Sequence, residues 1–177
     1  MLLDNTCFYT STSKRTINGN TIYPNNYEYS NIRAWLNGYN GSSYNVTDYT
    51  NIGFFDIAFT EEEQALIKTT LVDNSAETTD SSTNNYVCNN TNDKVYLLSF
   101  QDMLNSSYGF STDYTNYDTA RIGTTTDYAR SKGCWMNTSS TYYGNAQWWL
   151  RSPYYLDAYY AGYVYYYGYV SDDYYVD

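Results

Sequence analysis

Tyrosine is the residue type whose number and spacing could do chemistry in this chain. Residues 148–175 hold 11 of the 26 tyrosines. A tyrosine ring buries a large area while few torsions are fixed, and its hydroxyl donates and accepts hydrogen bonds, which suits the recognition of varied surfaces. Lysine, arginine and glutamate are absent after Arg151. The segment therefore favours binding by ring stacking and neutral hydrogen bonds over binding by charge.

Strand alternation within residues 163–170 predicts which rings are displayed. Alternate residues of a strand share a face, so the tyrosines at the odd positions should face solvent, and the face with Val164 and Val170 should pack. We expect one solvent-facing, ligand-binding patch with Trp148 or Trp149 at its edge. Its predicted residues are Trp149, Tyr154, Tyr155, Tyr159, Tyr160, Tyr163, Tyr165, Tyr167 and Tyr169. The alternative is a purely structural hairpin, because tyrosine also favours strands.

Composition excludes several kinds of site. The net charge is −10 and histidine is absent, so nucleic-acid binding is disfavoured and a histidine-based triad or metal site is excluded. Asp157, Asp172 and Asp173 could suggest calcium, but a calcium site needs several converging oxygens. We expect no catalytic residue, no metal ligand and no cofactor, and the predicted partner is a protein or a glycan. No segment reads as a membrane span or a signal peptide.

The three cysteines leave two alternatives. Cys7, Cys88 and Cys134 are widely spaced and form no CxxC pair, which argues against zinc. One disulfide with one thiol, and three thiols, are both compatible with the spacing.

Helix signals are local and clear. Ser30 is placed to cap a helix that carries Ile32, Trp35 and Leu36 on one face and ends before Gly38. Thr60 and Glu63 have the spacing of a capping box, and Ala65, Leu66 and Ile67 should then pack inward. A third helix is predicted over residues 126–132, and Ser99 should cap a short helix over 100–104.

The remaining pattern predicts a loop-rich α+β domain, with short helices around a small antiparallel sheet. Residues 1–3, 68–72 and 94–99 are the predicted strands, the last being the clearest buried one. Turns are predicted at Asn18-Gly19 and at Pro24, and residues 73–93 are predicted to be a mobile polar surface loop. The predicted core comprises Ile32, Trp35, Leu36, Phe55, Phe59, Leu66, Val95, Leu97 and Leu98.

Arg151 follows the tryptophan pair and precedes Pro153 by two positions. We interpret it as a buried or half-buried arginine that pairs with a carboxylate and stacks on Trp148 or Trp149, because the guanidinium group suits such sites. The alternative is a direct ligand contact.

Five short motifs occur in a recognisable order. They are SNIRAWLN at 30–37, AFTEE at 58–62, VYLLS at 95–99, ARSKG at 129–133 and WWLRSP at 148–153. With them the chain resembles a bacterial domain family of uncharacterised function that has a C-type-lectin-like fold. That family is similar to the variable proteins of diversity-generating retroelements in bacteria and phages. The resemblance implies a ligand-binding scaffold with a variable C-terminal region, no catalytic residues, and a cell-surface or extracellular location.

The end of the chain departs from this family. Members continue past the tyrosine-rich region with a closing strand, whereas this chain stops at Val176-Asp177, which puts the pairing of terminal strands in doubt. The prediction is one domain over residues 1–177, with truncation at one or both ends as an open alternative, and a ligand-binding region at 148–175. One alternative function is an adhesion or structural domain without diversification. A second alternative is an enzyme of the formylglycine-generating type, which is less favoured because Cys134 has no neighbouring cysteine.

Asparagine usage bears on diversification. Retroelement mutagenesis acts at template adenines, and one A-to-T change converts an asparagine codon into a tyrosine codon. All 20 asparagines lie at or before Asn145, and the segment beyond is rich in tyrosine and aspartate. Codon conversion explains this distribution, and so does the rarity of asparagine in strands.

Overall fold

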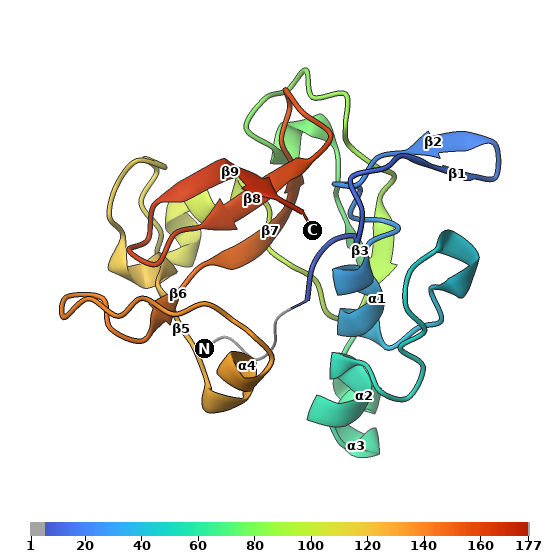
Figure 1. The fold of residues 1–177 in the computed structure, drawn as a ribbon, viewed down its shortest axis with the longest axis horizontal. Helices are drawn as coiled ribbons and strands as arrows, with labels where there is room; N and C mark the ends of the chain where they lie inside the picture. Colours follow the sequence, from blue (N-terminus) through green and yellow to red (C-terminus); the bar gives the residue numbers. More distant parts are fainter. Residues whose placement is uncertain (1–5, 177) are drawn as a thin grey trace.

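The structure is a computed structural model that describes residues 6–176. It is an α+β fold, in which a three-stranded sheet lies to one side of the molecule and three short helices to the other (Figure 1). The sheet has the order β7-β8-β9 and is antiparallel, so β8 is its central strand. Its strands are β7 (Trp148–Pro153), β8 (Tyr160–Val164) and β9 (Val170–Tyr175).

Smaller elements complete the fold. Two-stranded antiparallel pairs are formed by β1 (Arg15–Ile17) with β2 (Asn20–Ile22), β3 (Thr70–Val72) with β4 (Thr91–Asp93), and β5 (Gly123–Thr124) with β6 (Asn145–Ala146). The α-helices are α1 (Asn31–Asn37), α2 (Phe54–Ala58), α3 (Glu61–Leu66) and α4 (Asp127–Ser131). Short 3-10 helices span Ser42–Tyr44, Ala76–Thr78, Asp102–Leu104, Ser106–Tyr108 and Thr119–Arg121.

The helix caps predicted at Ser30 and Thr60 are confirmed, whereas the helix predicted over 100–104 is a 3-10 helix at Asp102–Leu104 whose N-cap residue is Gln101 rather than Ser99. Ser30 accepts a hydrogen bond from the Arg33 backbone N–H at 3.1 Å, and Gly38 ends α1 in the left-handed region with φ 64°. Thr60 and Glu63 form the predicted capping box. The helix predicted over residues 126–132 is α4, and Thr126, predicted as its first residue, is its cap. The Asn18-Gly19 turn is also confirmed, since both residues have positive φ, as a tight hairpin turn requires.

The prediction that α3 packs inward is wrong. Leu66 is 80 % exposed, and Ala65 is exposed beside it. The side chain that ties α3 to α2 is polar, because Gln64 donates to the Phe55 and Phe59 carbonyls at 3.2 and 3.0 Å. One short turn of helix held by these bonds does not need an apolar face.

Residues 94–99 do not form a strand, which corrects the clearest strand prediction. The pairing strand is β4, which ends at Asp93; residues 94–95 form a bend and residues 96–99 have no regular secondary structure. Their backbone groups bond to side chains instead: Asn37 accepts from the Lys94 N–H at 2.9 Å, and Arg151 donates to the Leu97 carbonyl at 2.8 Å. Residues 73–93 are likewise not one surface loop, because they contain the 3-10 helix Ala76–Thr78 and strand β4, and Asn84 is buried and donates to the Pro153 carbonyl at 2.8 Å.

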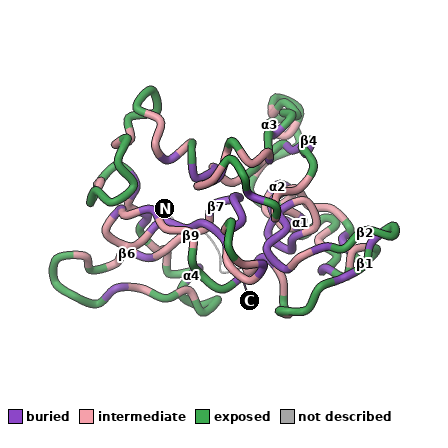
Figure 2. The backbone as a smooth tube through the Cα atoms, turned by 90° about the horizontal axis from the view of Figure 1, so that it is seen from above, coloured by how far each residue is buried: buried purple, intermediate pink, exposed green. Residues whose placement is uncertain are grey.

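Two apolar clusters form the core, and buried stretches alternate with exposed loops along the chain (Figure 2). The first contains Phe8, Tyr27, Ile32, Leu36, Ala161 and Val176, and the second Phe100, Met103, Leu150, Val164 and Val170. Ile32, Leu36 and Phe55 are buried as predicted. Trp35, Phe59, Val95, Leu97 and Leu98 are only half-buried at the edges of the packed regions.

The two described ends of the chain pair with each other. The Phe8 and Tyr9 N–H groups donate to the Val176 carbonyl at 3.1 and 3.2 Å. Among the described residues the two ends are thus joined by these hydrogen bonds and not by paired strands, and the strand predicted at residues 1–3 lies outside the described part.

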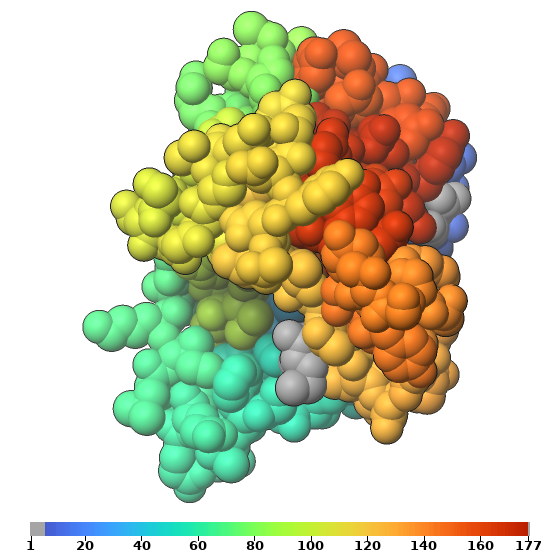
Figure 3. Space-filling view, turned by 90° about the vertical axis from the view of Figure 1, so that its left-hand side faces the viewer, coloured from blue at the N-terminus to red at the C-terminus, as the bar shows by residue number. Residues whose placement is uncertain are grey.

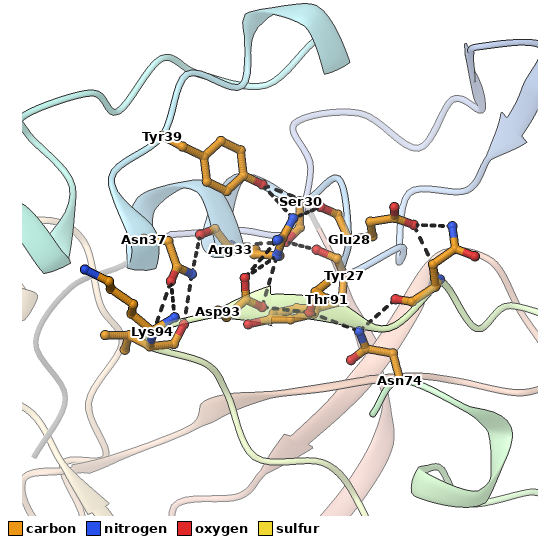
Figure 4. Close-up of polar contacts among 12 residues, drawn as sticks. Tyr27, Glu28, Ser30, Arg33, Asn37, Tyr39, Asn74, Thr91, Asp93 and Lys94 are labelled. Atoms are coloured by element: carbon orange, nitrogen blue, oxygen red, sulfur yellow. Dashed lines mark hydrogen bonds and ion pairs between the residues drawn. The ribbon is translucent and has the colours of Figure 1, made fainter. Parts of the chain in front are cut away.

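A polar clamp joins α1 to β4 (Figure 4). Arg33 contacts both carboxylate oxygens of Asp93, at 2.8 and 3.1 Å, and also donates to the Glu28 carbonyl at 2.7 Å. Thr91 donates to the same carboxylate at 2.7 Å. Since the Asp93 side chain is 1 % exposed, its carboxylate is buried, and both of its oxygens accept hydrogen bonds.

Candidate ligand-binding surface

The tyrosine-rich segment is organised around the tight turn that joins β8 to β9. Val164 pairs with Val170, and the Tyr165 N–H donates to the Tyr169 carbonyl at 2.8 Å. Gly168 has φ 88° and donates to the Tyr165 carbonyl at 2.9 Å. A three-residue loop that ends in a left-handed glycine is a favoured hairpin connection. The strand alternation predicted through residues 163–170 is therefore interrupted at the turn.

Three earlier parts of the chain hold this turn by its backbone. Arg121, which is 1 % exposed, donates to the Gly168 carbonyl at 3.4 Å and to the Met103 carbonyl at 3.0 Å. Asn145 donates to the Tyr166 carbonyl at 3.0 Å, and the Val170 N–H donates to the Tyr114 carbonyl at 3.0 Å. The turn is thus fixed without using its own tyrosine side chains.

Rings from these earlier segments gather against the turn. We define the aromatic surface as Tyr114, Tyr117, Tyr142, Tyr165, Tyr166, Tyr167 and Tyr169, which are linked by ring contacts. Tyr165 and Tyr167 stack at 5.1 Å between centroids with planes 16° apart. Tyr117, the most open of the set, is 70 % exposed. In the space-filling view the red hairpin lies between yellow and orange segments that precede it in the sequence (Figure 3).

The ring contacts do not unite the predicted patch. Tyr154, Tyr155, Tyr160 and Tyr175 form a second group at the other end of β8. Tyr159 is half-buried, and its N–H donates to the Asp157 carboxylate at 2.9 Å. With Tyr163, five of the eight predicted tyrosines therefore lie outside the aromatic surface.

Two other predicted residues, Tyr163 and Trp149, pack against the core. Tyr163 is 3 % exposed, which corrects the prediction that it faces solvent. It lies on the central strand, opposite Trp149, with the rings of Tyr165 and Tyr174 each at 5.0 Å. Trp149 is half-buried against the first core cluster, with its ring 5.3 Å from that of Phe8.

Sequence reasoning missed three rings of the aromatic surface that precede residue 148. Tyr114, Tyr117 and Tyr142 come from stretches rich in polar and turn-forming residues, where no periodic pattern marks a buried or displayed face. Strand alternation predicts Tyr166 on the packed face with Val164 and Val170. In the structure it is half-buried, and its ring contacts those of Tyr142 and Trp135.

Arg151 has the predicted structural role. It is 6 % exposed and pairs with Asp102 at 2.8 Å. The ring beneath its guanidinium group is Tyr96, 6.0 Å away, rather than either tryptophan. Its backbone N–H donates to the Leu98 carbonyl, and Ser152 accepts from the Phe100 N–H, both at 2.9 Å. The WWLRSP and VYLLS motifs thus hold each other in place.

Two hydroxyls of the aromatic surface have raised pKa values. Burial raises the pKa values of the Tyr167 and Tyr169 hydroxyls further above their usual value, so both stay protonated. Asp172 on β9 forms a carboxyl pair with Asp80: burial, together with a hydrogen bond to Asp80 and the charge of Asp80, raises the pKa of Asp172 to about 8. In residues 6–176 no group of three or more acidic or cysteine side chains is placed to hold a metal ion.

The chain belongs to a family described as a domain of unknown function (DUF6273), whose model matches residues 1–177. Comparisons with curated proteins and with solved structures gave no match. Among the described helices, none has the length and apolar character needed to cross a membrane.

Proposed function

We propose that this domain is a recognition module that binds a protein or glycan ligand through its aromatic surface. The observation that carries the proposal is the gathering of seven tyrosine rings from separate segments around one backbone-pinned turn. Large exposed aromatic patches on a monomer commonly mark interaction sites. Tyrosine supplies contact area and adaptable hydrogen bonds at low entropic cost.

The family resemblance supports the same function. A C-type-lectin-like fold, which we include in the proposal, is consistent with the terminal pairing of Phe8 with Val176 and with a small C-terminal sheet. In this proposal the domain acts outside the cell or at its surface, has no catalytic residue, and displays a tyrosine-rich segment diversified by a retroelement.

Binding is tested with ligands selected on the domain itself. Protein and peptide display libraries and a glycan array are screened with the unmodified domain. We expect the selected ligands to lose at least about tenfold in affinity, roughly 1.4 kcal/mol, with the double variant Tyr117→Ala, Tyr167→Ala. Tyr108→Ala is the matched control, because Tyr108 is 60 % exposed and lies outside the aromatic surface. Ligands that bind the double variant as well as the unmodified domain would refute the proposal.

Diversification is tested by sequencing the DNA around the gene. A neighbouring reverse transcriptase and a near-copy of the 3′ coding segment that differs only at adenines would establish it. A complete genome without either would leave the alternative, an adhesion domain that uses the same tyrosines without diversification.

A further inference from the structure

A pocket of about 430 Å³ opens beside the aromatic surface and shares none of its seven tyrosines. Four separate parts of the chain line it: the N-terminal segment at Thr6, the stretch after α4 that includes Trp135, the β6–β7 connection at Gln147 with the start of β7, and the sheet strands β8 and β9. Its volume falls in the range of roughly 300–1,000 Å³ that is typical of small-molecule sites.

Aromatic rings form one kind of wall in this pocket. Trp149 and Tyr174 are 5.5 Å apart with planes 69° apart, and Tyr174 continues to Tyr163 at 5.0 Å. Phe8 supports Trp149 at 5.3 Å, so these rings are held in position. Trp135 also lines the pocket and is 53 % exposed, which leaves an indole ring accessible to a ligand.

The polar groups of the lining are uncharged. Gln147 offers an amide and Thr6 a hydroxyl, and none of the described residues that line the pocket is Asp, Glu, Lys or Arg. The Tyr163 hydroxyl is oriented by Asp173 at 3.5 Å, whose carboxylate also accepts from Ser171 at 2.8 Å. Burial raises the pKa of Tyr163, so its hydroxyl stays neutral.

This combination selects a class of ligand. A charged ligand would find no counter-charge in the lining, and a purely apolar one would leave the amide and hydroxyls without partners, which is unfavourable when they are desolvated. A ring with one apolar face and several hydroxyls satisfies both kinds of wall. We propose that the pocket binds one uncharged pyranose ring, supplied as a monosaccharide or as the end of a glycan. This site does not depend on the proposed function, because its residues are different.

The test uses methyl glycosides of glucose, galactose, mannose and N-acetylglucosamine, with binding detected by saturation-transfer NMR and titrated by calorimetry. We expect at least one glycoside to bind and Gln147→Ala and Trp135→Ala to weaken it at least about tenfold. Tyr108→Ala should bind normally, since Tyr108 is 60 % exposed and belongs neither to the pocket nor to the aromatic surface. Oligosaccharides that end in the bound sugar then separate the two sources: tighter binding indicates a glycan end, and equal binding a monosaccharide.

Three results would overturn the pyranose site. They are no binding by any glycoside, binding that both pocket variants retain, and competition in which tetramethylammonium displaces every glycoside, which would assign the rings to a cation. Circular dichroism of each variant shows that it is folded. Failure of the aromatic surface is read separately, from Tyr117 and Tyr167 variants against library-selected ligands.

Discussion

Gly168→Ala should damage the turn that carries the aromatic surface. Two costs add at this position. A residue with a Cβ pays about 1–2 kcal/mol in the left-handed region, and Gly168 has φ 88°. The new Cβ would also lie 2.0 Å from the Asp118 carbonyl oxygen and 2.7 Å from its carbonyl carbon. These are backbone atoms, and relieving such overpacking typically costs a further ~1–3 kcal/mol.

Gly109→Ala is a matched control. Gly109 also has φ 88°, but a Cβ there would meet no atom within 4 Å. It should therefore show only the conformational cost, and the two variants should differ by ~1–3 kcal/mol in the free energy of unfolding. Urea titration followed by tryptophan fluorescence measures both, provided that the two m-values agree. Equal losses of stability would show that the turn does not rest against Asp118 as the structure has it.

Three further predictions concern charge. Asp93→Asn should lower the free energy of unfolding by ~3–5 kcal/mol, because it leaves the Arg33 guanidinium without its buried counter-charge. The control Asp127→Asn should lower it by less than ~1 kcal/mol, since the Asp127 side chain is 93 % exposed. Similar urea midpoints for the two variants would contradict this prediction. The pKa of Asp172 is raised from 3.8 to about 8, so the folded state binds the Asp172 proton more tightly than the unfolded state does, and the stability that this proton contributes is lost as pH rises from about 4 to 8. The Tm of Asp172→Asn relative to that of the unmodified domain should therefore rise over this pH interval. A Tm difference that stays constant with pH would refute the prediction. Calcium and chelator should leave the Tm unchanged, and a rise with calcium that chelator reverses would reveal a metal site.

The helix caps were predictable because each depends on residues only three or four positions apart. Ser30 and Thr60 each accept from a backbone N–H within the first turn of their helix. The same holds for the Asn18-Gly19 turn, whose positive φ values depend on those two residues alone. Local sequence carries all the information that such features need.

The strand at residues 94–99 and the inward face of α3 failed for the opposite reason. Both predictions assumed that apolar residues decide how a segment packs. In the structure Arg151 and Asn37, from distant parts of the chain, take the hydrogen bonds of residues 94–98, and Gln64 replaces an apolar contact for α3. The unequal fate of the tyrosines has a similar origin, since neighbouring strands and rings cover Tyr163 on the central strand but leave the turn half-exposed.

The way the turn is held has a consequence for variation in sequence. Arg121 and Asn145 contact the carbonyl groups of Gly168 and Tyr166, and Val170 reaches the Tyr114 carbonyl through its N–H. None of these bonds uses the side chains of residues 165–167. Those three side chains can therefore change without loss of the hydrogen bonds that shape the turn, whereas Gly168 cannot. A scaffold that fixes the backbone and leaves neighbouring side chains free is what a diversified recognition surface would require.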